Sequence, residues 1–347
     1  MKLPATSLAC ALLVSLPVGC GDDGTSDDDG AADDSSGTTT TTEPGSTDDA
    51  STGEPPGSTG TTGDGTDTSD STGQDSTGEA AEIDVSIQFA ARVGDEEASC
   101  GQIYEGIGAS GASIELLDFR FFVSNVRLVD DSGAETPLAM EDDGEWQLEG
   151  SALLDFENGG AGCSENTTAE TNTTLRGTVP DGTYTGIRFD VGLPFEQNHL
   201  NADEAPPPLN TTAMFWNWAA GYKFAKIDIA NDNEAPGNRW NLHLGSQGCD
   251  NGDAGPTVPP TEPCSRPGRP AIALDGFDPL SGTVVLDLAA VYDGVDVNAD
   301  TPMTAPGCMS FMPDVNECTD LFPNLGLSWD TGDCVDGCAN QIAFSAE

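Results

Sequence analysis

Residues 21–80 restrict where a folded domain can begin, because they cannot form a core. The segment consists almost entirely of Gly, Ser, Thr, Asp and Glu, with 16 acidic residues and no Lys or Arg. It buries too little apolar surface to offset the entropy lost on ordering, and its like charges favour an extended spacer. We therefore predict a disordered acidic tether over 20–80 and a single domain over 81–347.

The first residues are typical of an exported protein. Lys2 gives a positive start, and the apolar run over 3–18 has the length of a signal-peptide core but is too short to span a membrane. Gly19 before Cys20 resembles a bacterial lipobox, although Pro17 is atypical of it. We predict a signal peptide over 1–19 and lipidation of Cys20, giving an outer-membrane or cell-surface lipoprotein that faces the periplasm or the exterior. Ordinary secretion, with Cys20 as a spare thiol, is the alternative.

The charge of the chain argues against nucleic acid as a partner. The formal net charge is −49, and subtracting the 16 acidic residues of the tether leaves −33 for the rest. Such a field repels nucleic acid and anionic lipid and attracts cations and basic proteins. The same charge is also typical of salt-tolerant or extracellular proteins, so it identifies no partner by itself.

Eight cysteines follow Cys20, and they predict disulfides. An even number in an exported chain favours pairing, and the absence of a Cys-x-x-Cys pair disfavours a thiolate metal site. Many pairings are formally open. The simplest scheme joins neighbours along the chain: Cys100–Cys163, Cys249–Cys264, Cys308–Cys318 and Cys334–Cys338.

Alternation of apolar and polar residues predicts a mostly β fold, a β-sandwich with long loops. Ile83, Val85, Ile87 and Phe89 alternate with polar residues, which is typical of a half-buried strand. Turn-forming residues separate the segments, and no amphipathic helix exceeds about three turns. We expect short helices near 201–204 and 315–322. The predicted strands cover 83–89, 117–129, 184–191, 223–229, 239–244 and 283–290.

The chain has only two histidines, His199 and His243, and the aromatic segment Met214–Phe224 lies between them. Imidazole is the commonest side-chain ligand of copper and zinc, so a nitrogen-bound transition metal must use these two residues. Buried, hydrogen-bonded imidazoles are the alternative, with Trp216 and Trp218 as core packing. In an extended strand Trp240 and His243 point to opposite faces.

Other kinds of site have weaker support. The sequence contains no Gly-Lys-Ser/Thr phosphate loop and no Gly-x-Ser-x-Gly elbow, so we predict no enzyme. The acidic segment Asp293–Asp300 has oxygen ligands suited to Ca²⁺ but lacks EF-hand spacing. A solvated loop is therefore the favoured interpretation of that segment.

Several segments together resemble the MbnP-type copper-binding proteins, also described as the four-Cys metallo-mystery pair proteins. The resemblance extends from about residue 83 to 330, and the Trp-rich and His-Leu-Gly-Ser segments are its most specific parts. The matching segments are Phe119–Leu128, Leu153–Glu157, Gly192–Phe195, Asn198–His199, Pro208–Asn210, Met214–Phe224, His243–Ser246 with Cys249, and Gly307–Ser310 with Cys318.

The resemblance implies a function. Members of this family are extracytoplasmic and bind copper after a tryptophan has been oxidised to kynurenine by a dihaem partner similar to cytochrome c peroxidases. In this chain His199 and His243 match the family's histidines and become the candidate copper ligands. Trp216 and Trp218 match its tryptophan-rich strand and become the candidate kynurenine positions. Cys334, Cys338 and the tether are additions to the family pattern.

We therefore expect a copper-binding lipoprotein with no catalytic turnover of its own. Two alternatives remain at this point. One is a structural or adhesive surface lipoprotein, Ca²⁺-stabilised, with both histidines simply packed. The other is a redox enzyme that uses bound copper, although no sequence feature requires it.

Cys20→Ser is expected to release the protein from membranes, because it removes the acylation site. Detergent phase partitioning measures this directly: the wild-type protein should enter the detergent phase and the variant the aqueous phase. Equal partitioning of the two proteins would contradict the lipid anchor.

Overall fold

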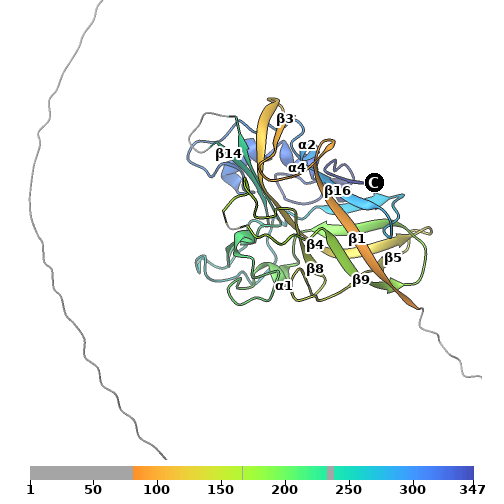
Figure 1. Ribbon diagram of the computed structural model, residues 1–347. Helices are drawn as coiled ribbons and strands as arrows, with labels where there is room; N and C mark the ends of the chain where they lie inside the picture. The colour runs from red at the N-terminus through yellow and green to blue at the C-terminus, as the bar shows by residue number, and fades with distance from the viewer. Residues whose placement is uncertain (1–80, 166, 233–237) are drawn as a thin grey trace, which may run out of the picture. The chain divides into compact units, whose positions relative to one another are not determined.

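The computed structural model describes residues 81–165, 167–232 and 238–347. The predicted signal peptide, Cys20 and the tether lie outside the described residues. Within them the chain is mostly β, with two large sheets and one two-stranded hairpin (Figure 1). The predicted fold class, a β-sandwich with long loops, is confirmed.

The larger sheet is built around one long strand, β4 (Ala112–Asp130). The middle of this strand, residues 116–124, is buried without a break, because both of its faces are covered there. Along the main path the sheet order is β15-β10-β4-β13-β14-β17, while β3, β5 and β8 also pair with β4, and β7 pairs with β8. The other strands are β3 (Ile103–Ile107), β5 (Glu135–Pro137), β7 (Gln147–Leu148), β8 (Ser151–Asp155), β10 (Tyr184–Val191), β13 (Ala225–Asn231), β14 (Arg239–Leu244), β15 (Ala271–Asp275) and β17 (Gly307–Cys308).

The smaller sheet brings the first and last strands of the domain together. Its order is β18-β16-β1-β9-β6, and β2 pairs with β1. The pairing of β1 with β16 is parallel, while β9 and β18 pair antiparallel to their neighbours. The strands are β1 (Glu82–Val93), β2 (Glu96–Glu97), β6 (Ala139–Met140), β9 (Thr174–Pro180), β16 (Thr283–Asp287) and β18 (Phe344–Ala346).

Aromatic side chains join the two sheets. Phe89 on β1 makes edge-to-face contacts with Phe121 on β4, at a centroid distance of 6.3 Å, and with Phe189 on β10, at 5.7 Å. Phe344 on β18 contacts the same two rings at 5.9 and 5.5 Å. Offset and edge-to-face ring pairs contribute about 0.5–1.5 kcal/mol each beyond their buried area. The predicted alternation in β1 thus places Phe89 in the core between the sheets.

The helices of the described residues are each a single turn. The helix predicted at 201–204 is wrong: those residues form turns, and the helix lies earlier. Asn201 Oδ1 accepts the N–H of Asp203 at 3.1 Å, and Pro206 follows closely, so the segment has local partners that compete with a helix. The helices are α1 (Phe195–Asn198), α2 (Leu288–Val291), α3 (Val315–Cys318) and α4 (Leu321–Asn324), and the 3₁₀ turns are η1 (Thr212–Met214), η2 (Met312–Asp314) and η3 (Val335–Cys338).

The last predicted strand, 283–290, is too long by three residues. Strand β16 ends at Asp287, whose carboxylate accepts the N–H of Ala289 at 2.9 Å and so caps α2. Aspartate is a favoured N-cap because its oxygen satisfies a free N–H of the first turn. Among the described residues no helix is long and apolar enough to span a membrane.

Four disulfides are present, so the prediction that the eight cysteines form disulfides is confirmed. Two of them hold loops beside the larger sheet, and Cys308–Cys318 connects β17 to α3. Each closes a loop within the described part of the chain. The pairs are Cys100–Cys163, Cys249–Cys264, Cys308–Cys318 and Cys334–Cys338.

Thiol counting on unfolded, unreduced protein is expected to find essentially no free thiol from the domain, because all eight cysteines are paired. The matched measurement after reduction should give the full number. Several reactive thiols before reduction would contradict the disulfide scheme and reopen a thiolate site.

Candidate metal centre

The tryptophan-rich segment forms a short hairpin rather than a long strand. Strand β11 (Phe215–Asn217) pairs with β12 (Gly221–Tyr222), and Met214 belongs to the preceding turn η1. Asn217 Oδ1 accepts the N–H of Ala220 at 2.9 Å and holds the turn of the hairpin. Trp216 and Trp218 remain partly exposed, so they are not packed in the core.

His199 follows α1 directly, and its hydrogen bonds define its tautomer. Its Nδ1 lies 3.0 Å from the carbonyl oxygen of Trp218, which can only accept, so Nδ1 carries the proton. The lone pair is therefore on Nε2. This atom accepts from Nδ2 of Asn198 at 3.1 Å and lies 3.4 Å from Sγ of Cys264. Burial lowers the pKa of His199, which favours the neutral ring.

His243 lies on β14 beside β13, opposite Lys226 in the register. Its Nε2 is 2.7 Å from Oδ1 of Asp228. Burial lowers the pKa of His243, and the opposing effect of Asp228 is smaller. Although burial acts against ionisation, contact with His243 and Lys226 lowers the pKa of Asp228. Nε2–H therefore donates to the carboxylate, and the lone pair is on Nδ1, to which no described residue makes a hydrogen bond.

Trp240 points away from His243, as the strand geometry predicts. It is 1% exposed, its Nε1–H donates to the carbonyl of Ala299 at 3.1 Å, and its ring packs edge-to-face on Tyr292. Its indole is therefore part of the interior. Trp216 and Trp218 are the tryptophans next to the two histidine segments.

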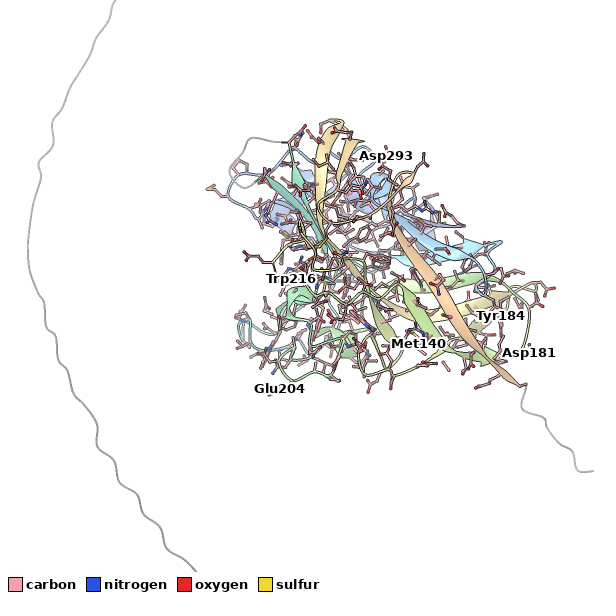
Figure 2. The ribbon with its side chains drawn as sticks, in the orientation of Figure 1. Met140, Asp181, Tyr184, Glu204, Trp216 and Asp293 are labelled. Atoms are coloured by element: carbon pink, nitrogen blue, oxygen red, sulfur yellow. A yellow bond between two sulfur atoms is a disulfide. The ribbon has the colours of Figure 1, made fainter. Side chains whose placement is uncertain are left out.

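The β11–β12 hairpin contacts both histidine segments. On one side, Trp218 accepts from His199, and the N–H of Tyr222 donates to Oδ1 of Asn198 at 2.9 Å. On the other side, the indole of Trp216 packs against Gly245, where a β-carbon would overlap the ring. Gly245 is two residues after His243, so the hairpin connects the two segments. Figure 2 places Trp216 on the side of the view where Glu204 lies, away from Asp181 and Tyr184.

A network of buried ion pairs continues from Asp228, the hydrogen-bond partner of His243. Lys226 Nζ donates to Asp228 at 2.6 Å and also contacts Asp118. Asp118 in turn accepts from Arg120 through Nε at 2.8 Å and Nη2 at 2.5 Å. Arg120 lies 3.6 Å from Glu157, whose oxygens accept loop N–H groups. Buried charges are tolerated when they are paired in this way.

One further carboxyl belongs to this buried region. Burial raises the pKa of Asp155 to about 8, and Glu157 acts in the same direction while Arg120 opposes it. The Asp155 side chain accepts the N–H of Glu157 at 3.1 Å and is 2% exposed. The protonated form is thus favoured at neutral pH.

The structure also brings together a set of residues that the sequence did not suggest. Ligand atoms of His199, Cys249 and Cys264 lie within 4.8 Å of one another, the one set of three His, Cys, Asp or Glu at this spacing in the described ranges. The two sulfur atoms form a disulfide, so neither is a thiolate.

Two residues that position the histidines were missed from sequence. Asp228 was detectable in principle, because strands 223–229 and 239–244 flank a Pro-Gly turn and would pair as a hairpin that places Asp228 near His243. Asn198 carried no such signal beyond its place beside His199. Its role depends on a contact with Tyr222, 24 residues away.

The fold and this arrangement define a two-sheet β protein with two neutral, buried histidines on either side of a tryptophan hairpin. Comparison with known proteins assigns its family. The MbnP family model matches residues 82–310. Among solved structures, MbnP from Methylosinus trichosporium is similar, with a TM-score of 0.65 and 31% sequence identity over 77% of this chain and 98% of that chain. A search of curated proteins found no match. The chain belongs to the MbnP family.

Asp155→Asn is expected to change the pH dependence of stability. The pKa of Asp155 is about 8 in the native state, whereas it is about 3.9 in the unfolded chain. The native state therefore binds the extra proton, and wild-type stability falls as pH rises through this window. The unfolding free energy of the variant, relative to wild type, should rise by up to about 1.4 kcal/mol per pH unit between pH 5 and 8. Chemical denaturation at several pH values measures it, and a constant difference would contradict the assignment.

Proposed function

We propose that this protein is an extracytoplasmic copper-binding lipoprotein whose metal is held by His199 and His243. Membership of the MbnP family, and the resemblance of the histidine and tryptophan segments to its copper-binding members, support the proposal. The protein acts as a copper carrier or store and performs no catalytic turnover of its own.

The donor chemistry fits copper. Both imidazoles are favoured in the neutral form, and neutral imidazole suits copper in either common oxidation state. The lone pairs available are Nε2 of His199 and Nδ1 of His243, as their hydrogen bonds dictate. Asp228 orients the ring of His243 through its other nitrogen, as carboxylates do for many metal-binding histidines.

The contact of one hairpin with both histidine segments carries the proposal. Trp218 accepts a hydrogen bond from His199, and Trp216 packs on Gly245 beside the His243 strand. The hairpin that carries both candidate kynurenine positions is therefore in contact with the segments of both candidate ligands.

A third donor is needed, because two imidazoles alone bind copper weakly compared with a larger ligand set. Indole Nε1 is a donor only and offers no useful lone pair. Kynurenine made from Trp216 or Trp218 would supply an aromatic amine and a carbonyl. Both tryptophans are partly exposed, so an oxidising dihaem partner of the cytochrome c peroxidase type has access to them.

Copper analysis of natively purified protein tests the assignment. Wild type should carry close to one copper per chain together with a peptide that contains an oxidised tryptophan, and His199→Ala or His243→Ala should lose the copper.

Asp228→Asn should keep both histidine ligands but weaken copper binding by about 10–100-fold, because the imidazole of His243 loses its orienting partner.

Asp181→Asn is the matched control for copper adsorbed on the acidic surface, because Asp181 is exposed and lies away from Trp216 in Figure 2. This variant should bind copper as wild type does. Copper binding that remains in both His199→Ala and His243→Ala would exclude a site formed by these two histidines. Absence of copper and of oxidised tryptophan from protein produced with its partner would favour the structural or adhesive alternative.

A further inference from the structure

The disulfide between Cys249 and Cys264 lies against the one ring nitrogen of His199 that has a lone pair. Sγ of Cys264 is 3.4 Å from Nε2, and ligand atoms of all three residues lie within 4.8 Å of one another. The opposite nitrogen is fixed by the carbonyl of Trp218, so the ring cannot simply exchange its two nitrogens. The lone pair of His199 therefore faces sulfur.

The distance between Nε2 of His199 and Sγ of Cys264 suits two ligands of one metal ion. A tetrahedral site has metal–nitrogen bonds of about 2.1 Å and metal–sulfur bonds of about 2.3 Å, which place the two donors about 3.5 Å apart. The observed nitrogen–sulfur separation of 3.4 Å is close to this edge. Only the sulfur–sulfur distance must change, from a bonded pair to two separate thiolates.

The base of the loop would keep the two cysteines close after the disulfide opened. Gln247 and Arg266 exchange two backbone hydrogen bonds, at 2.8 and 3.0 Å, and Ser265 N–H donates to Gly248 at 3.1 Å. These bonds lie immediately beside the two cysteines and do not depend on the disulfide. The thiols would thus remain within reach of one ion.

The site is also accessible. A hollow of about 310 Å³ reaches Cys249, and its other lining residues include Asn217, Ala219 and Gln247. Both Cys249 and Cys264 are partly exposed, whereas Cys308, Cys318 and Cys338 are buried. A reductant and a metal ion can therefore approach this disulfide from the hollow.

We propose that reduction of the Cys249–Cys264 disulfide creates a second metal site. In this site the two thiolates and Nε2 of His199 bind a soft cation such as Cu(I), Zn(II) or Cd(II). A Cys₂His set is a known zinc arrangement, and thiolates select Cu(I) and zinc. The site shares His199 with the proposed copper centre but uses neither His243 nor a modified tryptophan. The two sites compete for the same Nε2 atom, but the contacts that support this site do not rest on the proposed function.

The redox step requires a dithiol reductant. The sulfur–sulfur bond breaks, two electrons and two protons pass from the dithiol to Cys249 and Cys264, and the reductant becomes a disulfide. On metal binding each thiol releases its proton to solvent, and Nε2 of His199 gives up the hydrogen bond from Asn198 to the metal. After loss of the metal, exchange with a disulfide oxidant restores the Cys249–Cys264 bond, and the oxidant takes up the two electrons and two protons and becomes a dithiol.

Cadmium titration of the mature full-length protein tests the proposal, because thiolate-to-cadmium charge transfer gives an ultraviolet band. The protein is reduced anaerobically with limiting phosphine, alkylation mass spectrometry maps the opened disulfide, and far-UV circular dichroism monitors the fold. Reduced wild type and His243→Ala should each bind one Cd(II) with a two-thiolate band. Oxidised wild type should show no band, and His199→Ala should lose the tight binding phase.

The Cys249→Ser/Cys264→Ser double variant should show no cadmium band. His243→Ala should keep the cadmium band but lose the copper of the natively purified protein, so failure of this site and failure of the proposed copper centre are distinguishable. A reduced, folded wild type with both thiols mapped and no band would overturn the proposal, as would a band that persists in the double variant.

If reduction unfolds the domain, Cys249→Ser provides the second measurement. This variant frees the Cys264 thiol without any reductant, beside an intact His199. It should bind Cd(II) with a one-thiolate band that is lost in Cys249→Ser/His199→Ala. Equal cadmium binding by these two variants would overturn the proposal.

Discussion

The contact between Asp228 and His243 is the interaction on which the rest of the candidate centre depends. Asp228 is joined through Lys226 to Asp118, so a hydrogen bond to His243 and two buried ion pairs connect three neighbouring strands, β14, β13 and β4. Removing one partner of a buried ion pair costs about 3–5 kcal/mol, since the other charge is left uncompensated. A shift of one residue in strand register would turn these side chains to the opposite face. The pairing of charges and the pairing of strands therefore specify the same arrangement.

The two histidines are held in different ways. His243 lies on β14, between β13 and the short edge strand β17 of the larger sheet, where a carboxylate fixes one nitrogen and leaves the other free. His199 follows a single helical turn, and its partners are a loop carbonyl, the amide of Asn198 and a disulfide sulfur. The sheet thus provides a fixed donor, while loops provide the second donor and the groups around it. Opening the Cys249–Cys264 disulfide would act on this second, loop-built side.

Much of the sheet structure could be predicted from sequence. Strands 184–191 and 239–244 have the predicted bounds, because alternation of polar and apolar residues reflects directly which face is buried. The ends of strands and the positions of helices were less predictable. Asp287 ends its strand by capping a helix, and the turns at 201–204 replace the expected helix, since local side-chain hydrogen bonds outweighed weak periodicity. Core packing was left open as an alternative for Trp216 and Trp218, whereas the hairpin leaves both side chains partly exposed.

The sequence by itself determined which residues are available for chemistry. Because the chain has only two histidines, a metal bound through imidazole nitrogen is limited to His199 and His243, and the eight cysteines after Cys20 are available for disulfides. Strand alternation also separated Trp240 from His243, since successive side chains point to opposite faces. Only the tertiary structure decided which nitrogen of each ring keeps its lone pair. It also placed the Cys264 sulfur against His199, 65 residues away. Such contacts between distant segments arise from the packing of loops on the sheets, and no local pattern of residues encodes them.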